Sequence, residues 1–222
     1  MNVRVFNIPN MFSVLRIVLI PVFLYLIFLR TSEALMWGLV VFIIASFTDL
    51  LDGWSARKLQ QETSIGQFLD PLADKFLVIS AFLALLYLDP LIPFWMIAII
   101  VARDLLITMM RYLAIRKGTT LKTSRFGKVK TAFQMFSIVV ILMVFYFRFS
   151  GVDVAHTFNM DGYIKLDVAL EILQSDHPDK ILIVAPYMMM FIVTIMTALS
   201  GIRYFFTNWR IFLPPYSVSE GE

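Results

Sequence analysis

The sequence predicts an all-α integral membrane protein with six transmembrane helices, an N-terminal juxtamembrane segment before them, and both termini in the cytoplasm. Three observations predict this class. Of the 222 residues, 59% are hydrophobic, against roughly 45 to 50% in soluble domains. The apolar residues gather in six runs, and Lys and Arg accumulate on one side of these runs. We expect one domain over residues 1–222, with an extracytoplasmic loop at about 150–180.

The six apolar runs are the expected membrane spans, because a spanning helix needs about 20 mostly apolar residues. Several runs reach this length only if polar residues at their ends belong to the helix. The first run follows a short N-terminal stretch, but no small-residue cleavage pattern follows it, so we expect a span rather than a signal peptide. The runs are Met11–Leu29, Leu35–Phe47, Phe76–Leu88, Ile92–Ala102, Ala132–Phe147 and Ile181–Phe206.

Positive charge predicts the orientation, since cytoplasmic loops carry an excess of Lys and Arg. These residues concentrate between the second and third runs, between the fourth and fifth, and after the sixth. The loop at 150–180 is acidic, with a short helix expected at Leu166–Gln174. The protein is therefore expected to be a multi-pass protein of the cell (inner) membrane. The outer side holds only Arg30, Arg148, Lys165 and Lys180.

Composition also excludes several kinds of chemistry. The chain has no cysteine, which rules out disulfides, thiolate catalysis and Cys-ligated zinc. The net charge is a small +3, and we expect the lipid bilayer, not nucleic acid, as its macromolecular surrounding.

Four aspartates at the expected cytoplasmic ends of the second and third apolar runs are the main functional signal. Asp49 and Asp52 are three residues apart, and Asp70 and Asp74 are four apart, so on helices each pair shares a face. Carboxylates gathered at membrane depth repel one another unless cations neutralise them. An oxygen-only site suits Mg²⁺ or Mn²⁺ better than zinc. Two ions about 3.5 to 4 Å apart are usual for phosphoryl displacement, so the aspartates predict a two-metal site.

The residues between the two aspartate pairs fit a phosphate ligand. Gly53 and Ala56 leave no bulky side chain beside the carboxylates, and Arg57 offers a planar fork of donors. Gly66 is expected in the loop between the helices. Pro71 is expected in the first turn of the third helix, where its missing N–H costs nothing.

Other interpretations of the aspartates are weaker. Single aspartates at helix ends are often N-caps or solvated boundary residues, but four in a fixed order with Gly, Ala and Arg are not explained that way. A divalent-cation transporter would need carboxylates along its whole path, yet Leu35–Phe47 and Phe76–Leu88 carry no acidic residue. A polytopic prenyltransferase also uses two Asp-rich motifs, but normally has more spans.

The stretch from Asp49 to Asp74 resembles the signature of the CDP-alcohol phosphatidyltransferases, D-x-x-D-G-x-x-A-R, eight residues, then G-x-x-x-D-x-x-x-D. Every position is filled without a gap. The resemblance extends to NIPNMFSVLRIVLIP, ARDLLITMMRYLAIRKG and SRFGKVKTAFQM, over residues 7 to about 147. It implies a membrane enzyme of phospholipid biosynthesis that moves the phosphatidyl group of CDP-diacylglycerol to an alcohol and releases CMP.

The resemblance also implies roles for single residues. Two Mg²⁺ ions, with Mn²⁺ possible in their place, would be held by Asp49, Asp52, Asp70 and Asp74. Asp74 would in addition be the catalytic general base, and the active site would face the cytoplasm. A homodimer is implied as well. CDP-diacylglycerol would be bound by Asn10, Ser13, Gly53, Ala56, Arg57, Thr63 and Gly66.

The acceptor alcohol is suggested by basic residues in and after the fourth run. A phosphorylated acceptor such as glycerol 3-phosphate needs a cationic pocket, whereas serine does not. Inositol phosphate, serine and phosphatidylglycerol are the alternative acceptors. Lys and Arg at cytoplasmic helix ends are also expected from topology alone. The residues expected to bind the acceptor phosphate are Arg103, Arg111, Lys128, Lys130 and Arg203.

Overall fold

The computed structural model describes residues 8–59, 64–89, 92–117, 125–151, 166–176 and 178–209. Within these ranges the regular structure is helical and no strand occurs, so the all-α prediction is confirmed for this part of the chain. The helices are α1 (Ile8–Phe28), α2 (Ser32–Leu59), α3 (Ser64–Leu88), α4 (Phe94–Arg116), α5 (Arg125–Gly151), α7 (Leu166–Gln174) and α8 (Lys180–Asn208).

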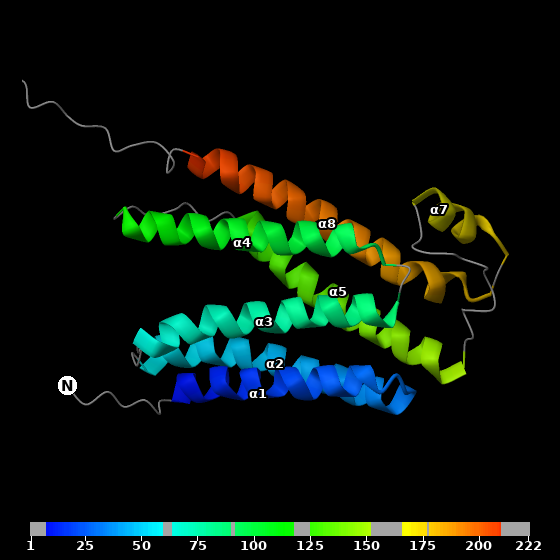
Figure 1. Cartoon of the computed structure of the whole chain (residues 1–222), viewed down its shortest axis with the longest axis horizontal. Coiled ribbons are helices and arrows are strands. Elements are labelled where there is room, and N and C mark those ends of the chain that lie inside the picture. The colour runs from blue at the N-terminus through cyan, green and yellow to red at the C-terminus, as the bar shows by residue number, and fades with distance from the viewer. Residues whose placement is uncertain are drawn as a thin grey trace, which may run out of the picture.

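The long helices form a bundle in which α1, α2 and α3 pack together and α4 packs beside α8 (Figure 1). The helix α5 runs obliquely through the bundle and contacts α2, α3 and α8. The first residues of α1 and the last residues of α8 lie at the same end (Figure 1). We call this the α2–α3 end, because α2 ends and α3 begins there.

Most helices are longer than the apolar runs that predict them. Three segments in the described part are long and apolar enough to cross a membrane: Met11–Phe28, Val129–Ser150 and Lys180–Asn208. Shorter apolar helical segments cover Ser32–Thr48 and Lys75–Leu88. The structure is therefore compatible with a membrane protein, and α2 and α3 both continue past their apolar segments into the aspartate-bearing stretch.

The start of α3 corrects two expectations. The helix begins at Ser64, so Gly66 lies inside α3 and not in a loop. Pro71 likewise lies in the helix interior rather than in its first turn, where it leaves one carbonyl of α3 without its backbone donor. The expectation followed the apolar run, which starts later than the polar first turns that belong to the same helix.

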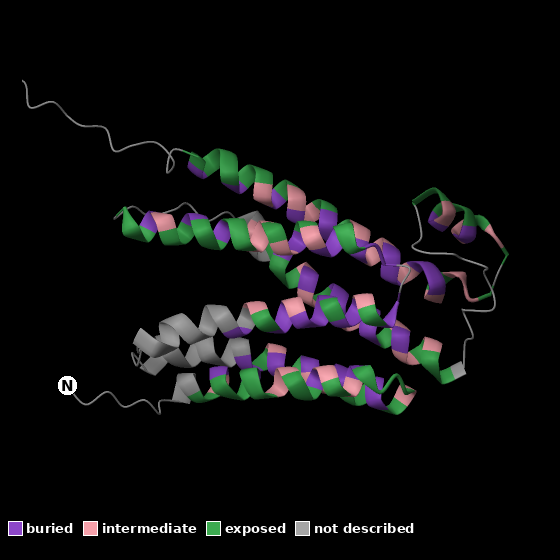
Figure 2. Cartoon of the chain, in the orientation of Figure 1, coloured by how far each residue is buried: buried purple, intermediate pink, exposed green. Residues whose placement is uncertain are grey.

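The core lies between the helices and is built from large apolar side chains. Phe23 of α1 and Phe42 of α2 are fully buried, with ring centroids 5.7 Å apart. Phe82 of α3 and Phe145 of α5 extend the same core. Figure 2 shows this buried inner side against exposed outer faces, which carry large apolar side chains such as Phe47. Apolar outer faces are what a lipid environment requires.

Two arginines link helices at the end opposite the α2–α3 end. Arg30 lies in the turn between α1 and α2 with φ of 52°, in the left-handed region that L residues seldom adopt. Its Nη2 donates to the Tyr87 carbonyl oxygen at 2.5 Å. Arg148 of α5 donates to Asp89 Oδ2, just after α3, at 2.6 Å. The carboxylate is only 2% exposed, so this is a buried ion pair.

The helix expected in the outer loop is confirmed with the predicted bounds. α7 covers Leu166–Gln174 and packs on α8. Its inward residues are Ala169 and Ile172, and Figure 1 places it at the end opposite the α2–α3 end.

Candidate active site

The predicted metal and nucleotide residues lie mainly on α2 and α3. Asp49 and Asp52 are in the last part of α2, and Asp70 and Asp74 are in the first part of α3. These helices contact each other and join at the α2–α3 end (Figure 1). The expected helical setting of both pairs is confirmed. For the following residues only the helical backbone is described, not the side chain: Asn10, Asp49, Asp52, Gly53, Ala56, Arg57, Gly66, Asp70, Asp74 and Lys128.

Thr63, the remaining nucleotide residue, falls outside the described residues. Among the side chains that are described, no group of three or more His, Cys, Asp or Glu gathers as a metal site. Because the four aspartate side chains are not among them, this finding does not bear on the metal prediction, which stays a prediction.

The packing of α1 against α2 brings the N-terminal motif to the level of the first aspartates. A Cβ atom at Gly38 would lie 2.9 Å from Ile27 Cδ1, and the Phe23 ring packs at a tilt against Phe42, so the two helices run antiparallel in a defined register. Arg16 is seven residues before Phe23, and Asp49 is seven residues after Phe42. The backbones at Arg16 and Asp49 are therefore level along the bundle.

Ser13 and Arg16 face inward from α1, and both are 0% exposed. They are three residues apart, one turn, and so share the face that packs on the bundle. The same register sets Ser13 level with Asp52. Ser13 was expected at the nucleotide, and this role stays a prediction. Arg16 was not among the expected site residues, although an arginine inside an apolar run is the signal that could have found it.

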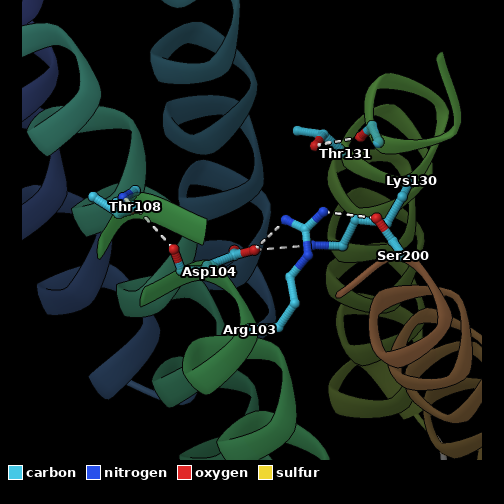
Figure 3. A network of polar contacts seen from close by, with 8 residues as sticks. Arg103, Asp104, Thr108, Lys130, Thr131 and Ser200 are labelled. Carbon is cyan, nitrogen blue, oxygen red and sulfur yellow. Dashed lines mark hydrogen bonds and ion pairs between the residues drawn. The ribbon is translucent and has the colours of Figure 1, made fainter. Parts of the chain in front are cut away.

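Several described polar side chains meet around Asp104 of α4 (Figure 3). Arg103 Nη1 donates to Asp104 Oδ1 at 2.7 Å. Lys130 of α5 donates to the same oxygen at 3.3 Å. The structure thus brings together Arg103 and Lys130, two of the residues expected to bind the acceptor phosphate.

A second contact ties Arg103 to α8. Its Nη2 donates to Ser200 Oγ at 2.7 Å, and Figure 3 shows the guanidinium spanning from Asp104 to Ser200. A Cβ atom at Gly201 would lie 2.8 Å from Arg103 Cγ, closer than side-chain carbons approach. Glycine at position 201 therefore lets the stem of Arg103 lie against α8.

A third contact joins this group to α3. Lys75 Nζ, one residue after Asp74, donates to Thr108 Oγ1. Thr108 in turn donates to the Asp104 carbonyl oxygen at 2.7 Å. We call Lys75, Arg103, Asp104, Thr108, Lys130 and Ser200 the Asp104 network. It links α3, α4, α5 and α8.

Burial separates the expected acceptor residues. Lys130 is 2% exposed and the Arg103 side chain 14%, whereas Arg111 and Arg203 are exposed. Arg111 is eight residues beyond Arg103 on α4, about 12 Å along the axis and about 80° around it. The two arginines therefore share a face only loosely, with Arg103 in the network and Arg111 nearer the helix end.

Sequence reasoning missed four members of the Asp104 network: Lys75, Asp104, Thr108 and Ser200. Asp104 left a visible signal, because an acidic residue inside an apolar run is expected to face a partner. Ser200 and the neighbouring Gly201 fit the small residues that let membrane helices approach closely. Thr108 gave no signal, since a threonine in a helix is common.

The comparisons with known proteins identify the family of the chain. The model of the CDP-alcohol phosphatidyltransferase family matches residues 6–164, a range that holds the four aspartates, Arg103, Asp104 and Lys130. This chain belongs to that family. The resemblance seen in the sequence is confirmed at the family level.

Three relatives with the same name show the similarity. The CDP-diacylglycerol--glycerol-3-phosphate 3-phosphatidyltransferase of Bacillus subtilis (strain 168) is 37% identical over 150 residues, 62% of this chain and 77% of the relative. That of Wigglesworthia glossinidia brevipalpis is 29% identical over 209 residues, covering 92% of this chain and 96% of the relative. That of Pseudomonas fluorescens is 37% identical over 142 residues, 61% of this chain and 72% of the relative.

Proposed function

We propose that this protein transfers the phosphatidyl group of CDP-diacylglycerol to sn-glycerol 3-phosphate, giving phosphatidylglycerophosphate and CMP. The observation that carries the proposal is the convergence of two cations, Arg103 and Lys130, on one oxygen of Asp104. This pair, in a chain of the CDP-alcohol phosphatidyltransferase family, suits an acceptor that bears a phosphate. The relatives' shared name supports the same acceptor.

The proposed chemistry has one bond formed and one broken. The acceptor hydroxyl oxygen attacks the phosphorus next to diacylglycerol, and the bond from that phosphorus to the CMP oxygen breaks. Asp74 takes the hydroxyl proton. Arg103 and Lys130 hold the acceptor phosphate, so the hydroxyl is positioned before it reacts, a contribution that can reach several powers of ten. The helix α3 carries Asp74 and, through Lys75, contacts the network that holds Arg103.

The donor set at the aspartates fits hard divalent cations. Asp49, Asp52, Asp70 and Asp74 offer only carboxylate oxygens, and each pair lies on one helix at a spacing that shares a face. Oxygen ligands suit Mg²⁺ or Mn²⁺. Bound ions would neutralise the pyrophosphate charge of the donor substrate. We propose two Mg²⁺ ions as the cofactor.

The remaining roles concern the donor substrate. Asn10, Ser13, Thr63 and Gly66 are proposed to line the cytidine diphosphate, with the small residues Gly53 and Ala56 giving it room against α2. Arg57 supplies a fork of donors for its phosphates. The two acyl chains would stay in the bilayer beside the apolar outer faces of the helices. Ser13 supports this assignment, since it is buried on α1 at the level of Asp52.

The proposed membrane arrangement has six spans, α1 to α5 and α8. The α2–α3 end faces the cytoplasm, both termini are cytoplasmic, and the protein resides in the cell (inner) membrane. The excess of Lys and Arg in the loops of this end supports the orientation, and so does the shared end of α1 and α8. We further propose a homodimer, as the family resemblance implies.

The test is a panel of acceptors. Purified protein in detergent with Mg²⁺ and CDP-diacylglycerol is given glycerol 3-phosphate, inositol phosphate, serine or phosphatidylglycerol, and CMP release is measured. We expect release with glycerol 3-phosphate. Release with one of the other acceptors alone would refute the proposed acceptor while leaving the reaction class. No release with any of the four would refute the proposed function.

A further inference from the structure

The carboxylate of Asp104 holds two cations from different helices at one place. Arg103 Nη1 lies 2.7 Å from Oδ1, and Lys130 Nζ lies 3.3 Å from the same atom. The two nitrogens are therefore within about 6 Å of each other, the sum of these distances. Like charges this close repel strongly where water is scarce, and Lys130 is almost fully buried.

Asp104 is thus the group that allows both cations to occupy the same region. Arg103 comes from α4 and Lys130 from α5, so their relative position depends on a shared partner rather than on one helix. The other end of the guanidinium is held by Ser200 of α8. A phosphate bound by two cations needs both of them in place before it arrives, because ordering long side chains on binding costs affinity.

The same residue connects the cations to the proposed catalytic helix. The Asp104 carbonyl oxygen accepts from Thr108, and Thr108 accepts from Lys75. Lys75 follows Asp74 directly in α3. A shift of Asp104 would therefore move the phosphate-binding cations relative to the proposed base.

We propose that Asp104 is a positioning residue for acceptor recognition: it keeps Arg103 and Lys130 oriented for the acceptor phosphate and so makes the enzyme selective for phosphorylated alcohols. This rests on the proposed function, because it takes the acceptor phosphate as the ligand of the two cations. In this proposal Asp104 touches neither substrate and acts only through the two cations that bind the acceptor phosphate. Replacing it should therefore weaken the use of the acceptor and leave the use of CDP-diacylglycerol unchanged.

The experiment measures kcat and KM for both substrates in the wild-type protein and in Asp104→Asn, by CMP release in detergent. We expect the KM for glycerol 3-phosphate to rise at least tenfold, with kcat and the KM for CDP-diacylglycerol within threefold of wild type. Asp104→Glu, which keeps the charge, should recover part of the loss. Asp167→Asn on the exposed face of α7 is the matched control and should behave as wild type.

The outcomes separate the two proposals. Wild-type protein that releases no CMP with glycerol 3-phosphate refutes the proposed function. An Asp104→Asn variant with an unchanged KM for glycerol 3-phosphate, or with equal losses for both substrates, refutes the positioning role alone. If Asp104→Asn does not fold, Asp104→Asn/Lys130→Met removes one charge of each sign. In the folded pair, a KM for glycerol 3-phosphate raised at least tenfold with the KM for CDP-diacylglycerol within threefold supports the role, and equal losses for both substrates or continued misfolding overturn it.

Discussion

Adding one methyl group at Gly201 should damage acceptor use although no charged residue is replaced. A Cβ atom there would lie 2.8 Å from Arg103 Cγ and 3.6 Å from Arg103 Cβ. Carbon atoms pack best at about 3.5 to 4.0 Å, so the stem of Arg103 must retreat by about 0.7 to 1.2 Å. The guanidinium hangs on this stem, and its bonds to Asp104 and Ser200 are both 2.7 Å long. A retreat of that size breaks or lengthens at least one of them.

The expected magnitude follows from these distances. A misplacement of about 1 Å can cost about a hundredfold in rate, so Gly201→Ala should lower kcat/KM for glycerol 3-phosphate by about ten- to a hundredfold. Overpacking lowers the free energy of unfolding by about 1 to 3 kcal/mol. Replacing a helical glycine by alanine raises it by about 1 kcal/mol. The net change in stability should therefore be small, and the variant should be recovered folded.

The control is the other glycine in close contact. A Cβ atom at Gly38 would lie 2.9 Å from Ile27 Cδ1, the terminal methyl of a flexible side chain that can turn away. Gly38→Ala should therefore retain wild-type kcat/KM. Both variants are compared by CMP release at varied glycerol 3-phosphate and by thermal unfolding in detergent. A Gly201→Ala protein with wild-type kcat/KM would show that the position of Arg103 does not matter for the acceptor.

Three more predictions concern the buried charges and the metal. Arg148→Met should lower the free energy of unfolding by about 3 to 5 kcal/mol, because it removes the arginine that pairs with the buried carboxylate of Asp89. Asp89→Leu/Arg148→Met should recover most of that loss. Thermal unfolding measures both variants, and a double variant no more stable than the single one contradicts the reasoning. Asp74→Asn should fold and bind Mg²⁺ yet lose nearly all CMP release, and normal turnover would remove Asp74 as the base. Chelation with EDTA should abolish CMP release and added Mg²⁺ or Mn²⁺ should restore it, whereas activity that persists in EDTA would argue against the metal site.

Most of the helices could be predicted, because long runs of apolar residues indicate membrane helices. Each of the long helices contains an apolar run, and α7 matches its expected bounds. The errors lie where polar residues continue a helix beyond its apolar part. The polar first turns of α3 are an example, since hydropathy alone does not distinguish them from a loop. Gly66 and Pro71 were misplaced for this reason.

The candidate site was predictable in its residue types and less so in its contacts. An arginine and a lysine near helix ends could be proposed as phosphate ligands from charge and depth. That Arg103 and Lys130 meet on a single oxygen of Asp104 depends on how α4 and α5 each pack against α8, and nothing in local spacing encodes it. The exposed positions of Arg111 and Arg203 follow from the same packing.

The two described ion-pair groups differ in a way that fits their proposed roles. At the end opposite the α2–α3 end, Arg148 meets Asp89 at 2.6 Å, an arrangement in which one cation faces one carboxylate and neither requires a ligand. In the Asp104 network, two cations converge on one carboxylate oxygen, and guanidinium and ammonium groups carry more donors than a single oxygen can accept. Arg103, Lys130 and Asp104 together carry one net positive charge, which a bound phosphate would neutralise through charge-assisted hydrogen bonds. The cationic group therefore belongs where an anion binds and leaves in each turnover, and the balanced pair belongs where the fold is held together.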